Sequence, residues 1–264
     1  MDGRRLWLRI RRVWIMLGLS ATVVFVTWSL IAYRASPAAR AAIRSDAAAA
    51  VRHEDGIWSF TPSRPVPAGR PALVFFPGAL VDPVAYAPLL RAVAGAGFPA
   101  YLVELPRRGA FGGADDPALD VRLERLLGRP GAPTRWIVAG HSRGGVVASR
   151  VAATRRGSGF AGLVLIGTSH PRDVDLGTLA VPVTKVVGTR DGLASPAEVE
   201  ANRAKLPRST RWVWIEGGNH SQFGWYGFQP GDRRATLAAS AQREAMIRAV
   251  LEALAGATSA APAS

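Results

Sequence analysis

The chain has 264 residues, and its 33 lysines and arginines outnumber its 19 aspartates and glutamates, which gives a formal net charge of +14. The basic residues are spread along the sequence and form no stripe interleaved with aromatic side chains, so no nucleic-acid partner is indicated. The sequence has no cysteine, which excludes disulfide bonds, a cysteine nucleophile and thiolate metal sites.

An uncharged apolar segment lies near the N-terminus, from Val13 to Tyr33. As a helix it would be about 30 Å long, which matches the hydrocarbon core of a bilayer. Residues 1–12 form a basic tail before it, and their charge favours a cytoplasmic N-terminus. We therefore predict a single-pass signal-anchor helix at residues 13–33, with the lipid bilayer as its partner. The rest of the chain would lie on the extracytoplasmic side of the cell membrane.

A cleaved signal peptide is the alternative interpretation of this segment, and it would release a secreted protein. The apolar region of a signal peptide usually has only about 7–15 residues, which is shorter than the segment here. The sequence therefore favours the uncleaved anchor.

The composition divides the remaining chain into a linker, a folded domain and a tail. Residues 34–55 are rich in alanine with scattered charges, and we expect a linker or a helical stalk there. Residues 56–255 hold the predicted domain. Residues 256–264 are small and polar, and we expect them to be disordered.

Apolar strand candidates alternate with helical patterns along the predicted domain. The strand candidates span residues 56–62, 72–76, 98–105, 134–139, 160–166, 181–187 and 211–215. Helical spacing is present at residues 82–96, between the Gly-rich loop at 107–116 and about residue 127, at 144–155 and at 233–254. Several strands are wholly apolar, which is typical of burial on both faces. The sequence therefore predicts an α/β fold, with a mostly parallel, doubly wound sheet and helices on both faces.

A Gly-x-Ser-x-Gly pattern lies between the strand candidate at 134–139 and the helix candidate at 144–155. A serine on such a sharp strand-to-helix turn has its hydroxyl exposed. Gly140 and Gly144 flank Ser142 because larger side chains would collide where the chain doubles back. The first N–H groups of the helix point at the same place, which suits a developing negative charge. Ser142 is therefore the candidate nucleophile.

The carboxyl ends of parallel strands are where reactive side chains of such a sheet collect. Asp191 follows the strand candidate at 181–187, and His220 follows the one at 211–215. The chain order Ser142, Asp191, His220 is the order of nucleophile, acid and base in a strand-turn-helix serine enzyme. In that chemistry the histidine takes the proton of the serine, and the acid orients the imidazole.

Other residues compete for the roles of acid and base. Glu216 is the alternative acid, although it lies only four residues before His220 and has little reach. His141, within the serine turn, and His170, after the strand candidate at 160–166, are alternative bases. Asp191 and His220 can also be interpreted without a catalytic role. Asp191 would then be a turn residue, and His220 a structural histidine of a loop.

The negative oxygen of an acyl-transfer intermediate needs backbone N–H donors, each worth about 3 kcal/mol. The N–H of Arg143 is the first candidate. The second comes from the loop after residues 72–76, where Pro77 has no N–H to donate. Ala79 is our choice there, with Leu80 as the alternative.

Four strings of residues carry a resemblance to a known family: FFPGALVDPVAYAPLL, GHSRGG, GTRDG and EGGNHSQFGWYG. Together with the rest of residues 72–254 they are similar to the α/β-hydrolase superfamily, in particular to its small, capless branch of dienelactone-hydrolase-like proteins. The resemblance implies that Ser142 is the nucleophile, Asp191 the acid and His220 the base. It also implies that the backbone amides of Ala79 and Arg143 form the oxyanion hole.

The chain departs from dienelactone hydrolases at Ser142, where those enzymes have a cysteine. This departure favours ordinary esters over lactones. The connection from Gly167 to Ala180 is short where many relatives insert a lid, so we expect an open site. The aromatic segment Gln222–Gly231 is a candidate wall of the pocket.

These features together predict a membrane-anchored serine hydrolase of the carboxylesterase type, which acts on a small-molecule ester through an acyl-enzyme on Ser142. A non-catalytic binding protein of the same fold, an acyltransferase and a cofactor-free peroxidase are alternatives. A haloalkane dehalogenase is disfavoured, because it would need an aspartate at position 142. We expect no cofactor and no metal, since no histidine–carboxylate cluster has ligand spacing.

Overall fold

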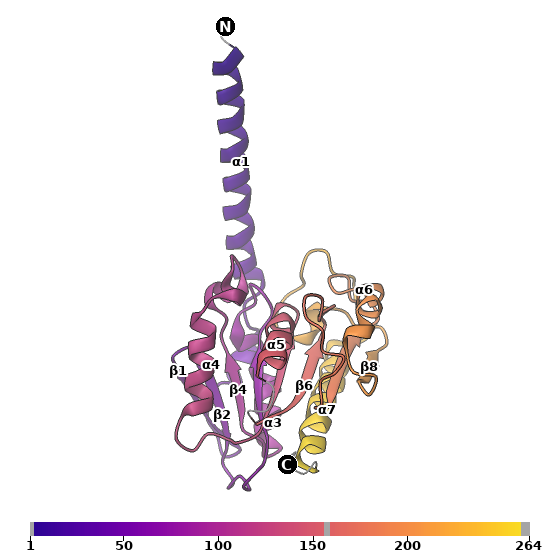
Figure 1. Ribbon diagram of the computed structural model, residues 1–264. Helices are drawn as coiled ribbons and strands as arrows, with labels where there is room; N and C mark the ends of the chain where they lie inside the picture. The colour runs from indigo at the N-terminus through magenta and orange to yellow at the C-terminus, as the bar shows by residue number, and fades with distance from the viewer. Residues whose placement is uncertain (1–2, 156–158, 260–264) are drawn as a thin grey trace.

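The computed structural model describes residues 3–155 and 159–259. They form an eight-stranded sheet with helices on both faces and a long N-terminal helix, α1 (Gly3–Ala32), that projects from the rest (Figure 1). The strands are β1 (Ala49–Glu54), β2 (Ile57–Pro62), β3 (Ala72–Phe76), β4 (Ala100–Val103), β5 (Trp136–His141), β6 (Phe160–Ile166), β7 (Val183–Gly188) and β8 (Arg211–Ile215). The other α-helices are α2 (Pro37–Ala41), α3 (Ala87–Gly95), α4 (Ala118–Gly128), α5 (Arg143–Thr154), α6 (Pro196–Ala201) and α7 (Ala239–Ser259).

The strands are arranged in the order β1-β2-β4-β3-β5-β6-β7-β8. All pairs from β4 to β8 are parallel, and β2 is antiparallel to both β1 and β4. The prediction of a mostly parallel sheet is therefore confirmed. Because parallel strands end at the same edge, the loops that follow β3 to β8 gather there. We call these loops the carboxyl rim; they span residues 77–82, 104–117, 142, 167–182, 189–195 and 216–238.

Two hydrophobic layers cover the sheet, one on each face. β3 shows the pattern, since all five of its residues are buried. Leu73 and Phe75 belong to the layer that includes α3 and α7, whereas Val74 and Phe76 belong to the layer that includes α4 and α5. The wholly apolar strands thus contribute alternate side chains to both layers, as the sequence predicted.

The expected linker at residues 34–55 is not a linker throughout, because it contains α2 and the edge strand β1. β1 pairs antiparallel with β2 through a turn at Asp55 and Gly56, whose φ angles are 50° and 74°. An Asp-Gly pair is a preferred choice for a tight hairpin turn that needs two positive φ angles. The sheet therefore begins at Ala49 rather than at residue 56.

The C-terminal helix also differs from its prediction. It begins at Ala239 instead of residue 233 and continues to Ser259, so residues 256–259 are helical rather than disordered. Ala257 is buried in the same hydrophobic layer as Leu254, which extends the packed face of the helix by a turn. Residues 260–264 of the expected tail lie outside the described residues.

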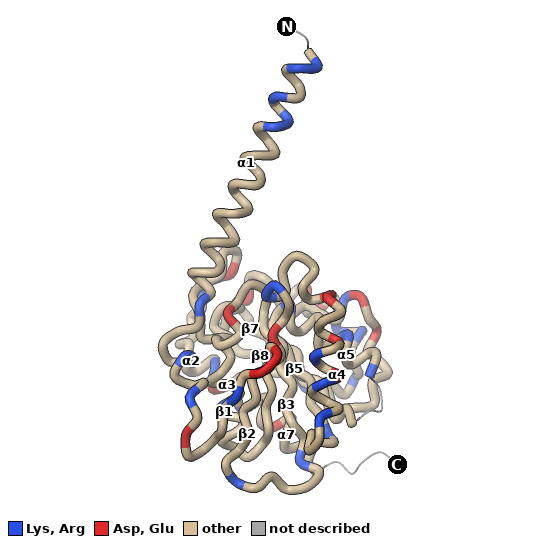
Figure 2. The backbone as a smooth tube through the Cα atoms, turned by 90° about the vertical axis from the view of Figure 1, so that its left-hand side faces the viewer, with Lys and Arg blue, Asp and Glu red and all other residues tan. Residues whose placement is uncertain are grey.

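α1 is the one helix among the described residues that is long and apolar enough to cross a membrane, a test that a signal sequence also passes. The helix begins at Gly3, so most of the expected basic tail belongs to it. Its arginines lie toward the N-terminal end, and an uncharged stretch leads down to the domain (Figure 2). Among its residues only those of the last turn are packed against the domain, where Ser29 and the residue after the helix, Tyr33, are buried.

Candidate active site

Ser142 occupies the turn between β5 and α5 with φ 53° and ψ −119°. A non-glycine residue in such a conformation stores backbone strain of order 1–3 kcal/mol, which the surrounding structure must offset. The Ser142 N–H donates to the Ile166 carbonyl (3.0 Å), and its carbonyl accepts from the Gly145 N–H (2.9 Å). These two hydrogen bonds hold the strained turn in place.

The two glycines of the turn are required by close backbone approach. A Cβ atom on Gly140 would lie 2.1 Å from the Gly144 carbonyl oxygen. A Cβ atom on Gly144 would lie 2.0 Å from the Phe76 carbonyl oxygen of β3. The predicted steric reason for both glycines is therefore confirmed.

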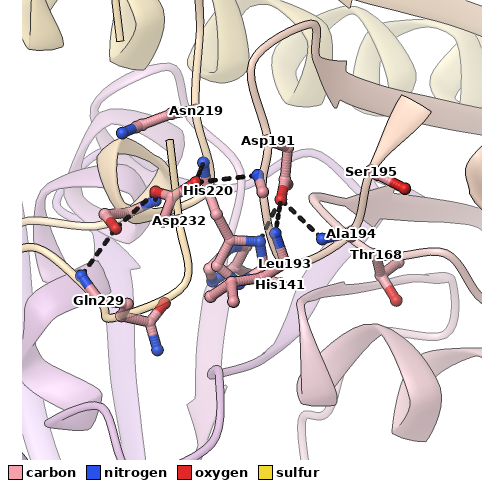
Figure 3. A network of polar contacts seen from close by, with 12 residues as sticks. His141, Thr168, Asp191, Leu193, Ala194, Ser195, Asn219, His220, Gln229 and Asp232 are labelled. Carbon is pink, nitrogen blue, oxygen red and sulfur yellow. Dashed lines mark hydrogen bonds and ion pairs between the residues drawn. The ribbon is translucent and has the colours of Figure 1, made fainter. Parts of the chain in front are cut away.

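Asp191 and His220 come together directly, although they follow different strands. The imidazole Nδ1 of His220 lies 2.9 Å from Asp191 Oδ2, and both side chains are buried (Figure 3). The other oxygen, Oδ1, accepts hydrogen bonds from the N–H groups of Leu193 (2.9 Å) and Ala194 (2.7 Å). Both carboxylate oxygens are thus used, and one of them orients the histidine.

The second ring nitrogen of His220, Nε2, is buried and has no hydrogen-bond partner within the described part of the chain. The ring lies beside the serine turn, since its centroid is 4.5 Å from that of His141, the residue before Ser142. No hydrogen bond joins His220 to the Ser142 hydroxyl among the described residues. Such catalytic hydrogen bonds are often long in a protein without substrate and tighten when it binds.

Asp232 organises the loops that carry this pair, and the sequence analysis did not single it out. Its Oδ1 accepts from the backbone N–H groups of His220 (3.3 Å) and Gly192 (3.0 Å). Its Oδ2 accepts from the N–H (2.8 Å) and the hydroxyl (2.7 Å) of Ser221. One carboxylate therefore joins the histidine loop to the loop of Asp191 (Figure 3).

The histidine loop is also fastened to α7. The amide of the buried Gln242 donates to the Asn219 carbonyl (2.6 Å) and accepts from the Asn219 N–H (3.0 Å). The Asn219 side chain donates to the Arg233 carbonyl (2.7 Å). These contacts fix the backbone directly before His220, and no local pattern in the sequence indicates them.

The loop after β3 distinguishes between the two candidate oxyanion donors. The N–H of Leu80 is already bonded to the Arg108 carbonyl (2.8 Å), so the alternative donor is occupied. The N–H groups of Ala79 and Arg143 have no acceptor within residues 3–155 and 159–259. Arg143 begins α5, whose first N–H groups lack partners inside the helix. Ala79 and Arg143 are thus the donors left free for a ligand.

Tyr86 holds this loop against the serine turn. Its hydroxyl accepts from the Gly78 N–H (3.1 Å) and lies 2.8 Å from His141 Nδ1. Burial raises the pKa of Tyr86, so its hydroxyl stays protonated. His141 therefore has a structural contact at one ring nitrogen.

The alternative bases are less suited to the chemistry than His220. Burial, with a smaller contribution from the charge of His220, lowers the pKa of His141 well below its ordinary value. Burial lowers the pKa of His170 to about 4. Neither imidazole makes a hydrogen bond to a carboxylate among the described residues. Glu216, the alternative acid, is exposed and makes no described hydrogen bond to His220.

The aromatic segment Gln222–Gly231 was a candidate wall of the pocket, but most of its aromatic side chains are packed against the rest of the protein. Phe223 is fully buried, with its ring 5.6 Å from that of His141. The Tyr226 ring lies 6.0 Å from Tyr33 at the foot of α1. Of the four aromatic side chains, only Phe228 is exposed. The segment thus packs between α1 and the serine turn.

The site as a whole provides a hydroxyl on a strained turn, a buried imidazole–carboxylate pair and two free backbone donors. These are the parts that acyl transfer by a serine requires. Across residues 3–155 and 159–259, no group of three or more histidine and acidic side chains is placed to hold a metal ion.

Comparison with known proteins agrees with this architecture. No curated protein matches the sequence. Similar solved structures include a dienelactone hydrolase-like promiscuous phosphotriesterase from metagenomic libraries (20% identity, TM-score 0.54, covering 78% of this chain and 98% of that one). A second is Est1E from Butyrivibrio proteoclasticus with ferulic acid bound (14% identity, TM-score 0.55, covering 75% of this chain and 95% of that one). A third is a thermophilic esterase from Thermogutta terrifontis (16% identity, TM-score 0.53, covering 77% of this chain and 95% of that one). Residues 72–244 match the model of the α/β hydrolase family, and the chain therefore belongs to that family.

Proposed function

We propose that this chain is a membrane-anchored serine hydrolase of the carboxylesterase type, which cleaves an ester through an acyl-enzyme on Ser142. The observation that carries the proposal is the state of His220. Its Nδ1 is held by the buried carboxylate of Asp191, while its buried Nε2 has no partner in the described chain. An imidazole arranged in this way is ready to accept one proton at Nε2.

The reaction begins with attack of the Ser142 hydroxyl oxygen on the ester carbonyl carbon, as His220 Nε2 takes the hydroxyl proton. The negative oxygen of the tetrahedral intermediate accepts hydrogen bonds from the N–H groups of Ala79 and Arg143. His220 then gives its proton to the leaving alcohol, and the acyl group stays on Ser142. A water molecule repeats the sequence and releases the acid. Asp191 stabilises the imidazolium in both halves.

The anchor is α1, with its apolar residues 13–33 in the bilayer and the sheet domain on the extracytoplasmic side. The proposal is supported by the length of the apolar run and by the arginines before it. We expect the intact chain to stay in membranes after carbonate extraction, with its original N-terminus. A mature N-terminus after Ala35 would instead identify a cleaved signal peptide.

Covalent labelling with a fluorophosphonate probe tests the serine mechanism. We expect the wild-type protein to be labelled and Ser142→Ala and His220→Ala to lose labelling. His170→Ala is the matched control, because His170 was an alternative base and makes no described hydrogen bond to a carboxylate; it should still be labelled. A folded wild-type protein that does not react would defeat the proposal.

A further inference from the structure

The foot of α1 is attached to the carboxyl rim, the same edge of the sheet that holds Ser142. The Tyr33 carbonyl accepts from the Asp82 N–H (3.0 Å), and the Ser36 N–H donates to the Trp225 carbonyl (2.8 Å). Asp82 lies in the loop after β3, and Trp225 lies in the loop after β8. Both views show α1 leaving the domain from this edge (Figures 1 and 2).

The length of α1 leaves no spacer between the domain and a membrane. A helix needs about 20 apolar residues to cross the hydrocarbon core of a bilayer. The uncharged run from Val13 to Tyr33 has about that length, and its last residue is already buried against the domain. The carboxyl rim therefore lies within about one helical turn, roughly 5 Å along the helix, of the edge of the hydrocarbon core.

Exposed apolar side chains project from the rim. Among the described residues outside α1, five large hydrophobic side chains are exposed, and three of them are on rim loops. These are Phe111 (68% exposed) after β4, Leu193 (39%) after β7 and Phe228 (49%) after β8. The other two, Val121 and Trp214, lie on α4 and β8. Aromatic and aliphatic side chains next to a membrane helix are suited to the bilayer interface.

Exposed arginines accompany these side chains. Arg190, Arg233 and Arg234 lie on the rim loops after β7 and β8, and Arg34 lies at the foot of α1. None of the four forms a salt bridge with a carboxylate in the described part of the chain. The rim loops also carry exposed carboxylates that form no described salt bridge, so the rim has no single sign of charge: Asp173, Asp175 and Glu216.

We infer that the carboxyl rim rests on the surface of a lipid bilayer and that Ser142 takes its substrate from that surface. The substrate class is an amphiphilic ester whose acyl chain partitions into the bilayer. The inference rests on the proposed function: the docking of the rim rests on the membrane anchor α1, and the choice of substrate rests on the serine mechanism. The docking of the rim follows from the position of α1 and from the exposed apolar side chains.

Docking can be measured without any assay of activity, because the chain has no cysteine. The full-length variants Phe111→Cys and Leu193→Cys, labelled with the environment-sensitive fluorophore NBD, report from the rim. Val121→Cys and Trp214→Cys are matched controls, since they replace exposed hydrophobic residues elsewhere. All four are reconstituted into vesicles of equal parts phosphatidylglycerol and phosphatidylcholine that contain doxyl-labelled lipid.

We expect blue-shifted emission and strong doxyl quenching at positions 111 and 193, and emission typical of water at the two control positions. Quenching at the rim positions should be about as strong in vesicles of phosphatidylcholine alone, because apolar side chains carry the docking. Rim probes that are quenched no more than the controls would overturn the docking of the rim. Quenching that disappears without phosphatidylglycerol would contradict docking through the apolar side chains.

The substrate class is tested by comparing p-nitrophenyl palmitate carried in these vesicles with water-soluble p-nitrophenyl acetate. The variant Phe111→Ser should lose about tenfold in rate on the vesicle-borne ester, because less apolar surface enters the bilayer. It should keep its rate on the soluble ester, and Val121→Ser/Trp214→Ser should keep both rates. An equal loss on both esters would contradict the inference.

The two proposals fail in different ways. A wild-type protein that is labelled by fluorophosphonate at Ser142, but shows no effect of the rim variants, would sink the inference and leave the serine mechanism standing. A protein that is never labelled would sink the mechanism, while the fluorescence measurement would still report whether the rim touches the bilayer.

Discussion

The Nδ1 atom of His220 lies 2.9 Å from Oδ2 of Asp191, and the two side chains meet in the interior from loops that follow different strands. Two backbone N–H groups hold the other carboxylate oxygen, so the direction of the acid is set by the chain around it. A carboxylate fixed in this way can hold an imidazole in one tautomer.

Asp191→Asn should keep the fold and lose most of the activity. The amide oxygen can still accept from Leu193 and Ala194, but the amide nitrogen toward His220 favours the wrong tautomer of the imidazole. We expect kcat on p-nitrophenyl butyrate to fall by about 10⁴-fold with little change in Tm. Asp175→Asn is the control, because this exposed aspartate accepts just one hydrogen bond in the described part of the chain, from the Gly177 N–H in a turn. Nearly wild-type kcat in Asp191→Asn would rule out its role as the acid.

Asp232→Asn should lower kcat, although Asp232 is not one of the residues proposed to act on the substrate. The substitution removes acceptors from a group that joins His220 and Ser221 to Gly192. We expect kcat to fall by about tenfold to a hundredfold, because small displacements of a catalytic group are costly. The free energy of unfolding should fall by about 1–3 kcal/mol.

The rate of fluorophosphonate labelling separates positioning from plain destabilisation in Asp232→Asn. It should fall in parallel with kcat at a temperature where the variant is fully folded, while KM changes little. Asp175→Asn again serves as the control. A variant that is less stable but labels at the wild-type rate would show that Asp232 has only a structural role.

Gly144→Ala should be strongly destabilising, because its Cβ would lie 2.0 Å from the Phe76 carbonyl oxygen. We expect a loss of about 3–5 kcal/mol in the free energy of unfolding. Gly128→Ala, at the end of α4, meets no atom within 4 Å and should stabilise by about 0.4–1 kcal/mol. Denaturant unfolding of both variants in detergent checks this pair. Similar changes in the free energy of unfolding for the two variants would contradict the steric explanation for Gly144 in the turn.

Lys185 should make stability depend on pH. It is buried on β7, its ammonium group donates to the His170 carbonyl, and burial lowers the pKa of Lys185 from 10.5 to about 7. Between these values the unfolded chain binds more protons than the folded one, so stability rises as pH rises from 7 to 10.5. At pH 7 and below, the folded state still carries the cost of the buried charge.

Lys185→Met removes that cost and should raise stability at pH 7 by about 1–4 kcal/mol. The difference from wild type should narrow as pH approaches 10, which thermal unfolding across the pH range will measure. Lys205→Met replaces the other lysine, which is only half-buried, and should change stability by about 0.5 kcal/mol or less. If the stability difference between Lys185→Met and the wild type does not narrow as pH rises, the charge of Lys185 is not the cause of that difference.

Much of the site could be predicted because each candidate residue follows an apolar strand. Parallel strands end at one edge, so the sequence predicts that Ser142, Asp191 and His220 lie near one another. The pairing of Asp191 with His220 agrees with that expectation, and the catalytic roles stay a prediction. The edge strand β1 was missed because its alanines give weak alternation, although the Asp55-Gly56 pair was a turn signal.

The local features of this protein were determined by its sequence alone. Apolar runs produce buried strands, an uncharged run of about 20 residues produces a helix long enough for a bilayer, and Gly140 stands where a Cβ would strike the Gly144 carbonyl oxygen. Each of these depends on neighbours in the chain.

The tertiary structure alone decided which backbone donors are free, that Asp232 joins two loops, and that α1 leaves from the rim that holds Ser142. Each of these depends on segments far apart in sequence. Hydrogen bonds and packing contacts arise only when such segments approach within a few ångströms, and no spacing of residues along the chain records that approach.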